Sequence, residues 1–339
     1  MKSKISNYTI ATLGSHTALQ ILKGARDEGF KTLCICPTGR EQVYKSFGVA
    51  DEILTLKKYT DFFKLESQII KRNAIIIPHG SYVEYIKTEN IEKLKIPYYG
   101  SKKILNWESN RTKQHEWLKK AGLKLPKIFK HYQDIDRPAI IKFHGAGGGK
   151  DYFIANSPAE FKKHMDEYDF DKPYVIQEYI VGVPMYAHYF YSRIRNELEI
   201  MGFDKRYESN ADSIGRIAAR DQMSSYIKTS YTIAGNTPVV IRESLLPEIY
   251  DLGLRVIKTA SELENGGLWG PFCLEGIIDP QLNFYVFEIS ARIVAGTNPY
   301  INGSPYTWLK YNEPMSTGRR IARDIKEAIE AEKLNLVLG

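Results

Sequence analysis

The first hundred residues alternate short apolar runs with helical patterns, and this alternation restricts the fold of the chain more than any other feature. Strands that are connected through helices form βαβ units, so the pattern predicts a parallel sheet. Such sheets bind ligands at the carboxyl ends of their strands, which here carry Gly14–Thr17 and His79–Ser81. The expected strands are Thr9–Leu13, Thr32–Cys36, Glu52–Leu56 and Ala74–Pro78, and the expected helices are Ala18–Glu28 and Phe62–Lys71.

The pattern changes after a charged amphipathic helix that we expect at Asn110–Gly122. Strands and helices are then mixed without regular alternation, which favours an α+β second half. The 339 residues exceed what one compact core usually holds, so two or three packed domains are expected. The main expected elements are strands at Pro138–Phe143, Tyr152–Ala155, Tyr174–Ile180, Tyr186–Arg193 and Leu198–Phe203, and helices at Pro247–Ser261 and Arg319–Lys333.

Composition excludes several classes of protein. Hydrophobic residues make up 43% and charged residues 26% of the chain, which is typical of a soluble globular protein. No apolar run reaches the roughly 18 residues of a membrane span, so no membrane partner is expected. The formal net charge is +7, but the basic residues are scattered without a run of five, so a phosphorylated small molecule is favoured over nucleic acid. Three cysteines and an N-terminus without an apolar stretch predict a cytoplasmic location.

A glycine-rich loop follows the expected strand at Pro138–Phe143. It has the sequence HGAGGGK at residues 144–150, after Lys142. Four glycines in five positions let backbone N–H groups approach phosphate oxygens closely. A Walker A loop is excluded, because Asp151 replaces its Ser or Thr and a strand follows in place of a helix. A hairpin loop that closes over a triphosphate remains, with an ordinary turn as the alternative.

Glu275 and Glu288 flank the turn 279–283 of an expected hairpin, Phe272–Ile278 and Asn283–Ile289. If the turn leaves an even number of residues unpaired, both carboxylates lie on one face of the hairpin. Like charges so placed repel each other unless one is protonated or a cation lies between them. Magnesium prefers such oxygen ligands. Alternation also predicts Arg292 on the face of Glu288, where it could meet a phosphoryl group. The alternative is two solvent-facing glutamates.

Taken in order, these segments resemble the ATP-grasp superfamily. More narrowly, the chain resembles the archaeal formate-dependent synthetases of purine (IMP) biosynthesis, which join formate to AICAR with ATP and form FAICAR. The resemblance runs along essentially the whole chain, in the motifs Gly14–Ala25, Pro78–Ser81, Ile176–Tyr179, Ile214–Ile217 and Phe287–Arg292. It implies an α/β and α+β fold, in which a Rossmann-like parallel-sheet domain (1–108) precedes a two-part ATP-grasp fold with a small subdomain (109–182) and a large subdomain (183–339).

The resemblance also implies site residues. His16, Ser81 and Asn236 would contact AICAR, and Glu275 and Glu288 would bind Mg²⁺, with Mn²⁺ as an alternative. Lys142 and Arg292 would act in catalysis by stabilising developing charge. The small-molecule partners would be ATP, formate and AICAR, and a homo-oligomer is expected. The residues that would hold ATP are Lys142, His144, Gly147, Gly148, Gln177, Glu178, Tyr179, Val181 and Glu208.

Two residues depart from the usual pattern. Ser290 stands where many ATP-grasp enzymes have an asparagine ligand, so a third protein ligand of the metal is in doubt. Asp151 follows the glycine loop, and an acid beside a triphosphate is unfavourable unless its side chain points away.

Several site residues also have structural explanations. Ser81 is a good N-cap for a helix at Tyr82–Lys87, and His16 could simply start a helix. Asn236 lies in a segment whose composition is typical of a turn, and Glu208 could be a surface residue. Other functions also stay open: an ATP-grasp ligase with another acceptor, a nucleotide-binding regulator without turnover, or, more weakly, a NAD oxidoreductase.

Overall fold

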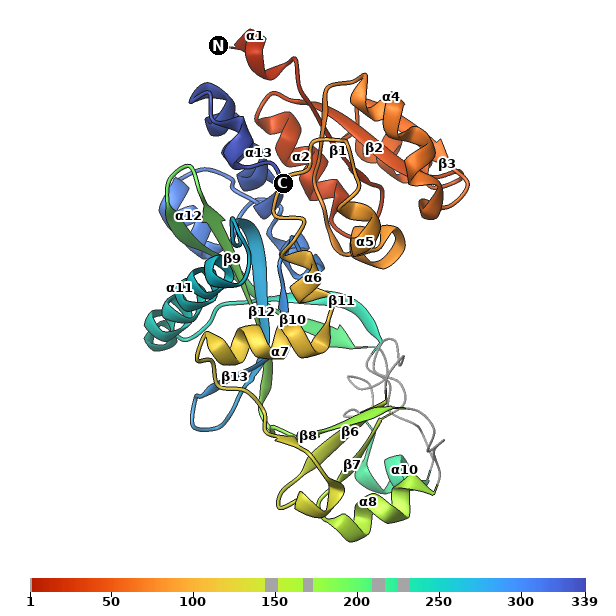
Figure 1. The fold of residues 1–339 in the computed structure, drawn as a ribbon, viewed down its shortest axis with the longest axis vertical. Helices are drawn as coiled ribbons and strands as arrows, with labels where there is room; N and C mark the ends of the chain where they lie inside the picture. Colours follow the sequence, from red (N-terminus) through yellow and green to blue (C-terminus); the bar gives the residue numbers. More distant parts are fainter. Residues whose placement is uncertain (1, 144–151, 167–172, 209–216, 225–231) are drawn as a thin grey trace.

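The computed structural model describes residues 2–143, 152–166, 173–208, 217–224 and 232–339. Three sheets follow one another along the molecule. Figure 1 shows the N-terminal sheet at one end, a small sheet at the other, and a long five-stranded sheet between them. No helix in these ranges is both long and apolar enough to cross a membrane.

The N-terminal sheet is parallel, as predicted, with the strand order β3-β2-β1-β4. Its central strand, β1 (Thr9–Leu13), is buried along its whole length, because helices cover both faces of such a sheet. The other strands are β2 (Lys31–Pro37), β3 (Glu52–Leu56) and β4 (Ala74–Ile76). The helices are α1 (Lys2–Ile5), α2 (Ala18–Asp27), α3 (Glu41–Phe47), η1 (Tyr59–Leu65), α4 (Glu66–Ile70), η2 (Tyr82–Ile86) and α5 (Thr88–Ile91).

Two helices lead out of this domain, α6 (Leu105–Glu108) and α7 (Arg111–Lys120). The side chain of Asn110 accepts hydrogen bonds from the backbone N–H groups of Thr112 and Lys113, which fixes the start of α7. The predicted connector helix is therefore present.

The small sheet is antiparallel, has the order β5-β8-β6-β7, and has its own apolar core. Ser157 caps its helix through a hydrogen bond from the N–H of Glu160, with Pro158 in the first turn, as the sequence predicted. Its elements are β5 (Ile128–Phe129), η3 (Tyr132–Asp134), β6 (Ala139–Phe143), β7 (Tyr152–Ala155), α8 (Pro158–Met165) and β8 (Tyr174–Glu178).

The five-stranded sheet is antiparallel in the order β11-β10-β9-β12-β13. One face packs on α7 and α11 (Leu246–Leu263), with Tyr189, Leu274, Trp117 and Val256 in one core. The strands are β9 (Val183–Ser192), β10 (Glu197–Glu208), β11 (Ile233–Val239), β12 (Gly270–Ile278) and β13 (Phe284–Ser290). The remaining helices are α10 (Ala219–Ser224), η4 (Glu243–Leu245), η5 (Ala295–Tyr300), α12 (Pro305–Tyr311), α13 (Thr317–Glu330) and η6 (Leu334–Leu336).

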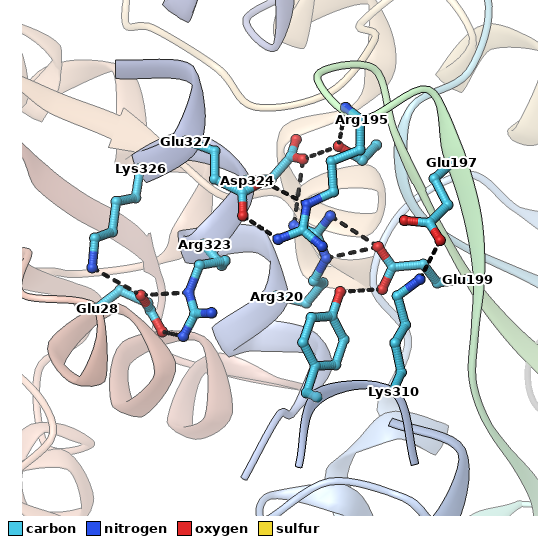
Figure 2. A network of polar contacts seen from close by, with 12 residues as sticks. Glu28, Arg195, Glu197, Glu199, Lys310, Arg320, Arg323, Asp324, Lys326 and Glu327 are labelled. Atoms are coloured by element: carbon cyan, nitrogen blue, oxygen red, sulfur yellow. Dashed lines mark hydrogen bonds and ion pairs between the residues drawn. The ribbon is translucent and has the colours of Figure 1, made fainter. Parts of the chain in front are cut away.

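Helix α13 connects the N-terminal domain to this sheet. It packs so closely on α2 that a Cβ on Gly24 would lie 2.3 Å from the backbone nitrogen of Arg319. Figure 2 shows the charges at this contact, where the buried Glu28, which directly follows α2, pairs with Arg323, among other bases of α13. On the other side of α13, the fully buried Arg320 pairs with Glu199 of β10 at 2.9 Å. Helix α13 thus contacts both the N-terminal domain and the five-stranded sheet.

Some local predictions were wrong. The helix expected at Phe62–Lys71 begins earlier, as the 3₁₀ turn η1, and continues as the short α4. Ser81 makes no side-chain cap, because its hydroxyl donates to Ser15 Oγ at 2.9 Å. Asn236 lies in the middle of β11 and not in a turn. Because β11 is an edge strand, it tolerates Pro238, which lacks an N–H.

Candidate functional site

One face of the five-stranded sheet is polar. Directly paired residues of neighbouring strands point to the same side. The cross-strand pairs Asp204–Tyr186, Tyr186–Glu275 and Glu275–Glu288 therefore form one continuous row. The pair Arg206–Asn236 extends this row on the same face, because Arg206 is two residues beyond Asp204 in β10. The face opposite the apolar core thus carries the predicted metal carboxylates and two further charged groups.

Glu275 and Glu288 are directly opposite each other across β12 and β13, as predicted. The reason differs from the expected one. The turn leaves the odd number of five residues, Asp279 to Asn283, between the last pair, Ile278 and Phe284. A β-bulge then adds one residue, Phe287, to β13 and returns the two carboxylates to the same face.

Arg206 forms an ion pair with Glu275, and its guanidinium lies 4.1 Å from the centre of the Tyr186 ring. Ser290 also donates a hydrogen bond to Glu275 Oε1, at 3.1 Å. Glu275 is 2% exposed, so these two contacts compensate a charge that is removed from water. The sequence analysis missed Arg206; the only signal was its position in the expected strand region next to Glu208.

Glu288 has solvent-accessible surface, yet surrounding protein desolvates it. This desolvation and the neighbouring Glu275 charge raise the pKa of Glu288 to about 7. A divalent cation fits such a pair, because its charge would compensate both carboxylates, whereas Arg206 forms an ion pair with Glu275. Within the described ranges no group of three His, Cys, Asp or Glu could hold a metal, so the site among these residues is the pair Glu275 and Glu288.

Lys142 projects from β6 of the small sheet and donates a hydrogen bond to Gln177 Oε1 at 2.9 Å. Its amine also lies 5.7 Å from the centre of the Phe287 ring, on the bulge of β13. Burial and then the charge of Arg111 lower the pKa of Lys142, whereas Glu288 acts in the opposite direction. Lys142 therefore connects the small sheet to the carboxylate pair.

The carboxyl ends of β1 and β4 bring His16 and His79 together, with stacked rings 5.2 Å apart. His79 is buried, and its Nε2 lies 2.9 Å from the carbonyl oxygen of Leu13. His16 has a left-handed backbone (φ 56°), a conformation that is uncommon for residues other than glycine. Although His16 has exposed surface, desolvation, then His79, Arg292 and Arg206, lower its pKa well below the usual value. The ring is therefore neutral at physiological pH.

Arg292 follows the end of β13 and pairs with the buried Glu108 of α6, with 3.1 Å between Nε and Oε1. The other oxygen of Glu108 accepts the N–H of Ala291 at 2.8 Å. A Cβ on Gly80 would lie 2.8 Å from His16 Nε2 and 3.6 Å from Arg292 Cζ. Arg292 thus lies at the junction between the N-terminal domain and the carboxylate pair. The sequence analysis missed Glu108.

The remaining site residues are distributed over two regions. Glu178 ends β8 and pairs with Arg137 at 3.2 Å, and the N–H of Tyr179 donates to Pro138 O at 2.8 Å. Val181 is 67% exposed, and Glu208 ends β10. Asn236 donates to Asp204 Oδ2 at 2.7 Å. His144, Gly147 and Gly148 lie outside the described residues.

Comparison with known proteins places this arrangement in a family. Residues 159–339 match a model described as "Domain of unknown function (DUF1297)", and residues 10–129 match "Protein of unknown function (DUF1246)". The chain is 53% identical over 337 residues to the 5-formaminoimidazole-4-carboxamide-1-(beta)-D-ribofuranosyl 5'-monophosphate synthetase of Pyrococcus abyssi, covering 97% of this chain and 98% of that one. The chain belongs to this synthetase family. The synthetase of Methanocaldococcus jannaschii is 44% identical, with 98% and 95% of the two chains covered.

Comparison with solved structures also supports membership of the synthetase family. The crystal structure of an IMP biosynthesis protein PurP from Thermococcus kodakaraensis matches with a TM-score of 0.77 at 31% identity, covering 97% of this chain and all of that one. An N5-carboxyaminoimidazole synthetase from Staphylococcus aureus, complexed with ADP, matches at 19% identity and a TM-score of 0.62, covering 86% and 72% of the two chains. The fold is therefore the ATP-grasp fold.

Proposed function

We propose that the chain formylates AICAR to FAICAR with ATP and formate, releasing ADP and phosphate, in IMP biosynthesis. The observation that carries this proposal is the 53% identity to a curated synthetase over nearly the full length of both chains. The adjacency of His16, Gly80 and Arg292 adds support, because it brings the N-terminal domain next to the carboxylate pair.

The proposed reaction has two steps. A formate oxygen attacks the γ-phosphorus of ATP, and ADP leaves, giving formyl phosphate. The amine nitrogen of AICAR then attacks the formyl carbon; the carbon–oxygen bond to phosphate breaks, and the amine proton passes to the released phosphate. Because this amine is a weak base, positioning and charge neutralisation are expected to contribute more than a strong general base.

Each basic residue has a task in this scheme. Lys142 would contact the ATP phosphates from the small sheet, held in place by Gln177. Arg292 would neutralise charge on the transferred phosphoryl group, held in place by Glu108. Gln177 to Val181 would bind adenine, and Glu208 the ribose. His16 and Ser81 would hold the ribotide, with His16 as a neutral hydrogen-bonding ring.

Glu275 and Glu288 would hold Mg²⁺, with Mn²⁺ as the alternative. The raised pKa of Glu288 and its position opposite Glu275 support this assignment. When bound, such a cation neutralises charge on the phosphate oxygens of ATP. Arg206 would share Glu275 with the cation.

The division into residues 1–108, 109–182 and 183–339 belongs to the same proposal, and the separate apolar core of the small sheet supports it. We also propose a homo-oligomer. Trp308 and Leu309 of α12 are 50% and 84% exposed, and large apolar side chains at a surface favour association. Light scattering of wild type and of the variant L309D tests this proposal. If both proteins form a dimer or a larger assembly, α12 is not the contact between subunits.

The test of the reaction is phosphate release from ATP, with formate and AICAR omitted in turn. We expect release only when both are present, with FAICAR identified by mass. No release with AICAR, but release with another amine or acid of a substrate panel, would indicate an ATP-grasp ligase with another acceptor. ATP binding without phosphate release over a panel of acids and amines would indicate a regulator.

A further inference from the structure

Three polar side chains form a series across β11, β10 and β9. Asn236 Nδ2 donates to Asp204 Oδ2 at 2.7 Å, and Asp204 Oδ1 lies 2.7 Å from His188 Nε2. Asp204 is 1% and His188 2% exposed, whereas Asn236 is only partly buried. Polar groups as deeply buried as Asp204 and His188 are costly unless they are paired, so the series has a defined arrangement.

The chemistry of the groups fixes the direction of each hydrogen bond. An ionised carboxylate only accepts, so the Asp204 oxygens must face the amide nitrogen of Asn236 and a protonated Nε2 of His188. His188 Nδ1 is buried without a partner among the described residues, so Nε2 is the ring nitrogen that hydrogen-bonds to Asp204. With its nitrogen committed to Asp204, Asn236 keeps its Oδ1 as an acceptor, and no described residue donates to that oxygen.

The loop above this series packs tightly on Asp204 and His188. Gly296 of η5 lies so close that a Cβ there would be 2.1 Å from Asp204 Oδ1 and 2.8 Å from His188 Cε1. The same loop reaches the N-terminal domain, since Asn298 Nδ2 donates to the backbone oxygen of His16 at 3.0 Å. Asn236 is therefore connected both to the sheet that carries Glu275 and to the loop that contacts His16.

We propose that Asp204 and His188 are positioning residues, which hold Asn236 with Oδ1 directed at the amine that is formylated. This inference rests on the proposed function. An oxygen acceptor in that position binds an N–H of the amine and leaves the nitrogen lone pair free to face the formyl carbon. It also selects for an acceptor substrate that carries a donor at that point, because an analogue without one leaves Oδ1 unpaired.

A purely structural role makes a different prediction. If the series only ties three strands together, its loss lowers stability and affects all substrates alike. If it orients Asn236, its loss raises the KM for AICAR while the KM values for ATP and formate stay constant. The ratio of these constants separates the two roles.

Asp204→Asn is the most informative variant, because asparagine has the same size and shape as aspartate. Its amide group can donate hydrogen bonds, whereas the carboxylate of Asp204 can only accept them. The amide that this substitution introduces can offer its nitrogen to Asn236, which lets the Asn236 side chain turn and present its own nitrogen to the amine. We expect the KM for AICAR to rise roughly tenfold, the effect of one lost hydrogen bond. Asn236→Ala should give a similar rise. The double variant should be no worse than Asn236→Ala alone, because Asp204 acts only through Asn236.

His188 offers a matched pair of variants. Glutamine and methionine have similar length, but only glutamine keeps an N–H donor for Asp204. We expect His188→Gln to preserve the KM for AICAR within about twofold and His188→Met to raise it several-fold, with the KM values for ATP and formate unchanged in both; His188→Met should also melt at a lower temperature, because it leaves Asp204 Oδ1 without a donor. This pair decides the question if Asp204→Asn does not fold.

The outcomes separate the inference from the proposed function. If the wild-type protein releases no phosphate with ATP, formate and AICAR, the proposed function is wrong, and this inference is wrong with it. An active wild type overturns the inference alone if Asp204→Asn folds with an unchanged KM for AICAR, or raises all three KM values equally. Additive effects of the Asp204 and Asn236 variants overturn it as well, as do equal KM values in the His188 pair.

Discussion

Glu275 and Glu288 face each other across β12 and β13, and of these two carboxylates Glu275 forms the ion pair with Arg206. One positive charge therefore compensates one carboxylate of a close pair, and the second carboxylate has a pKa raised to about 7 by desolvation and by its neighbour. This asymmetry makes the pair receptive to a cation.

Replacing Glu288 by glutamine removes this repulsion. We expect E288Q to melt at a higher temperature than wild type without metal at pH 8, and to lose ATP-dependent product formation by a factor on the order of 10² or more. Circular dichroism melts and phosphate release measure the two effects. E330Q, on the exposed end of α13, is the control and should match wild type in both. A fully active E288Q would remove the metal assignment.

Arg206 is expected to share Glu275 with the bound cation. In R206M the two carboxylates lose their compensating charge, so the protein without metal should be destabilised by about 3–5 kcal/mol. Millimolar Mn²⁺ should then raise the melting temperature more than it does in wild type, because the cation supplies the missing charge. K205M removes an exposed lysine that alternates to the other side of β10, and serves as the control. Equal metal-induced shifts in R206M and wild type would contradict this role.

The hydrophobic pattern of the sequence predicted most helices and strands, but it did not predict the ion pairs between residues that are distant in the sequence. The buried run Thr9–Leu13 and its helical partners were sufficient for the parallel sheet, because periodicity is a local property. The opposition of Glu275 and Glu288 was predicted, but its cause, the bulge at Phe287, leaves no clear mark in composition. Arg206 and Glu108 were missed because their partners, Glu275 and Arg292, are distant in sequence. The alternative of a turn at Asn236 was wrong, because tertiary pairing with β10 overrides the local preference of its neighbours.

Acid should weaken the contact between α2 and α13. Burial alone would raise the pKa of Glu28, but hydrogen bonds from Arg323 and Arg319 outweigh it and lower the pKa to about 2. A carboxylate whose pKa is lower in the folded state stabilises the protein above its unfolded value of 4.5, and this stability is lost as the pH falls toward 2. E28Q should therefore be less stable than wild type by about 2–3 kcal/mol at pH 7, and the difference should shrink near pH 3.

Asp27 provides the control for this experiment. It is the exposed neighbour of Glu28 in α2 and pairs with Lys23 at the surface. D27N should change stability by less than about 0.5 kcal/mol at either pH, because exposed ion pairs contribute little. Urea unfolding of both variants at pH 7 and pH 3 makes the comparison. A constant difference between E28Q and wild type over this range would show that the Glu28 charge is not what holds the helices.

Gly80 has no side chain, and the His16 ring occupies the space where one would lie. A Cβ at this position would be 2.8 Å from His16 Nε2 and 3.0 Å from its Cδ2, closer than such atoms normally approach. His16 cannot move toward His79 without breaking their stacking, so G80A should push its ring toward the substrate side. We expect the KM for AICAR to rise roughly tenfold, as for a lost hydrogen bond, with the KM for ATP unchanged. G235A is the matched control, since no atom lies within 4 Å of a Cβ there. If G80A and G235A bind AICAR equally well, His16 does not contact the ribotide.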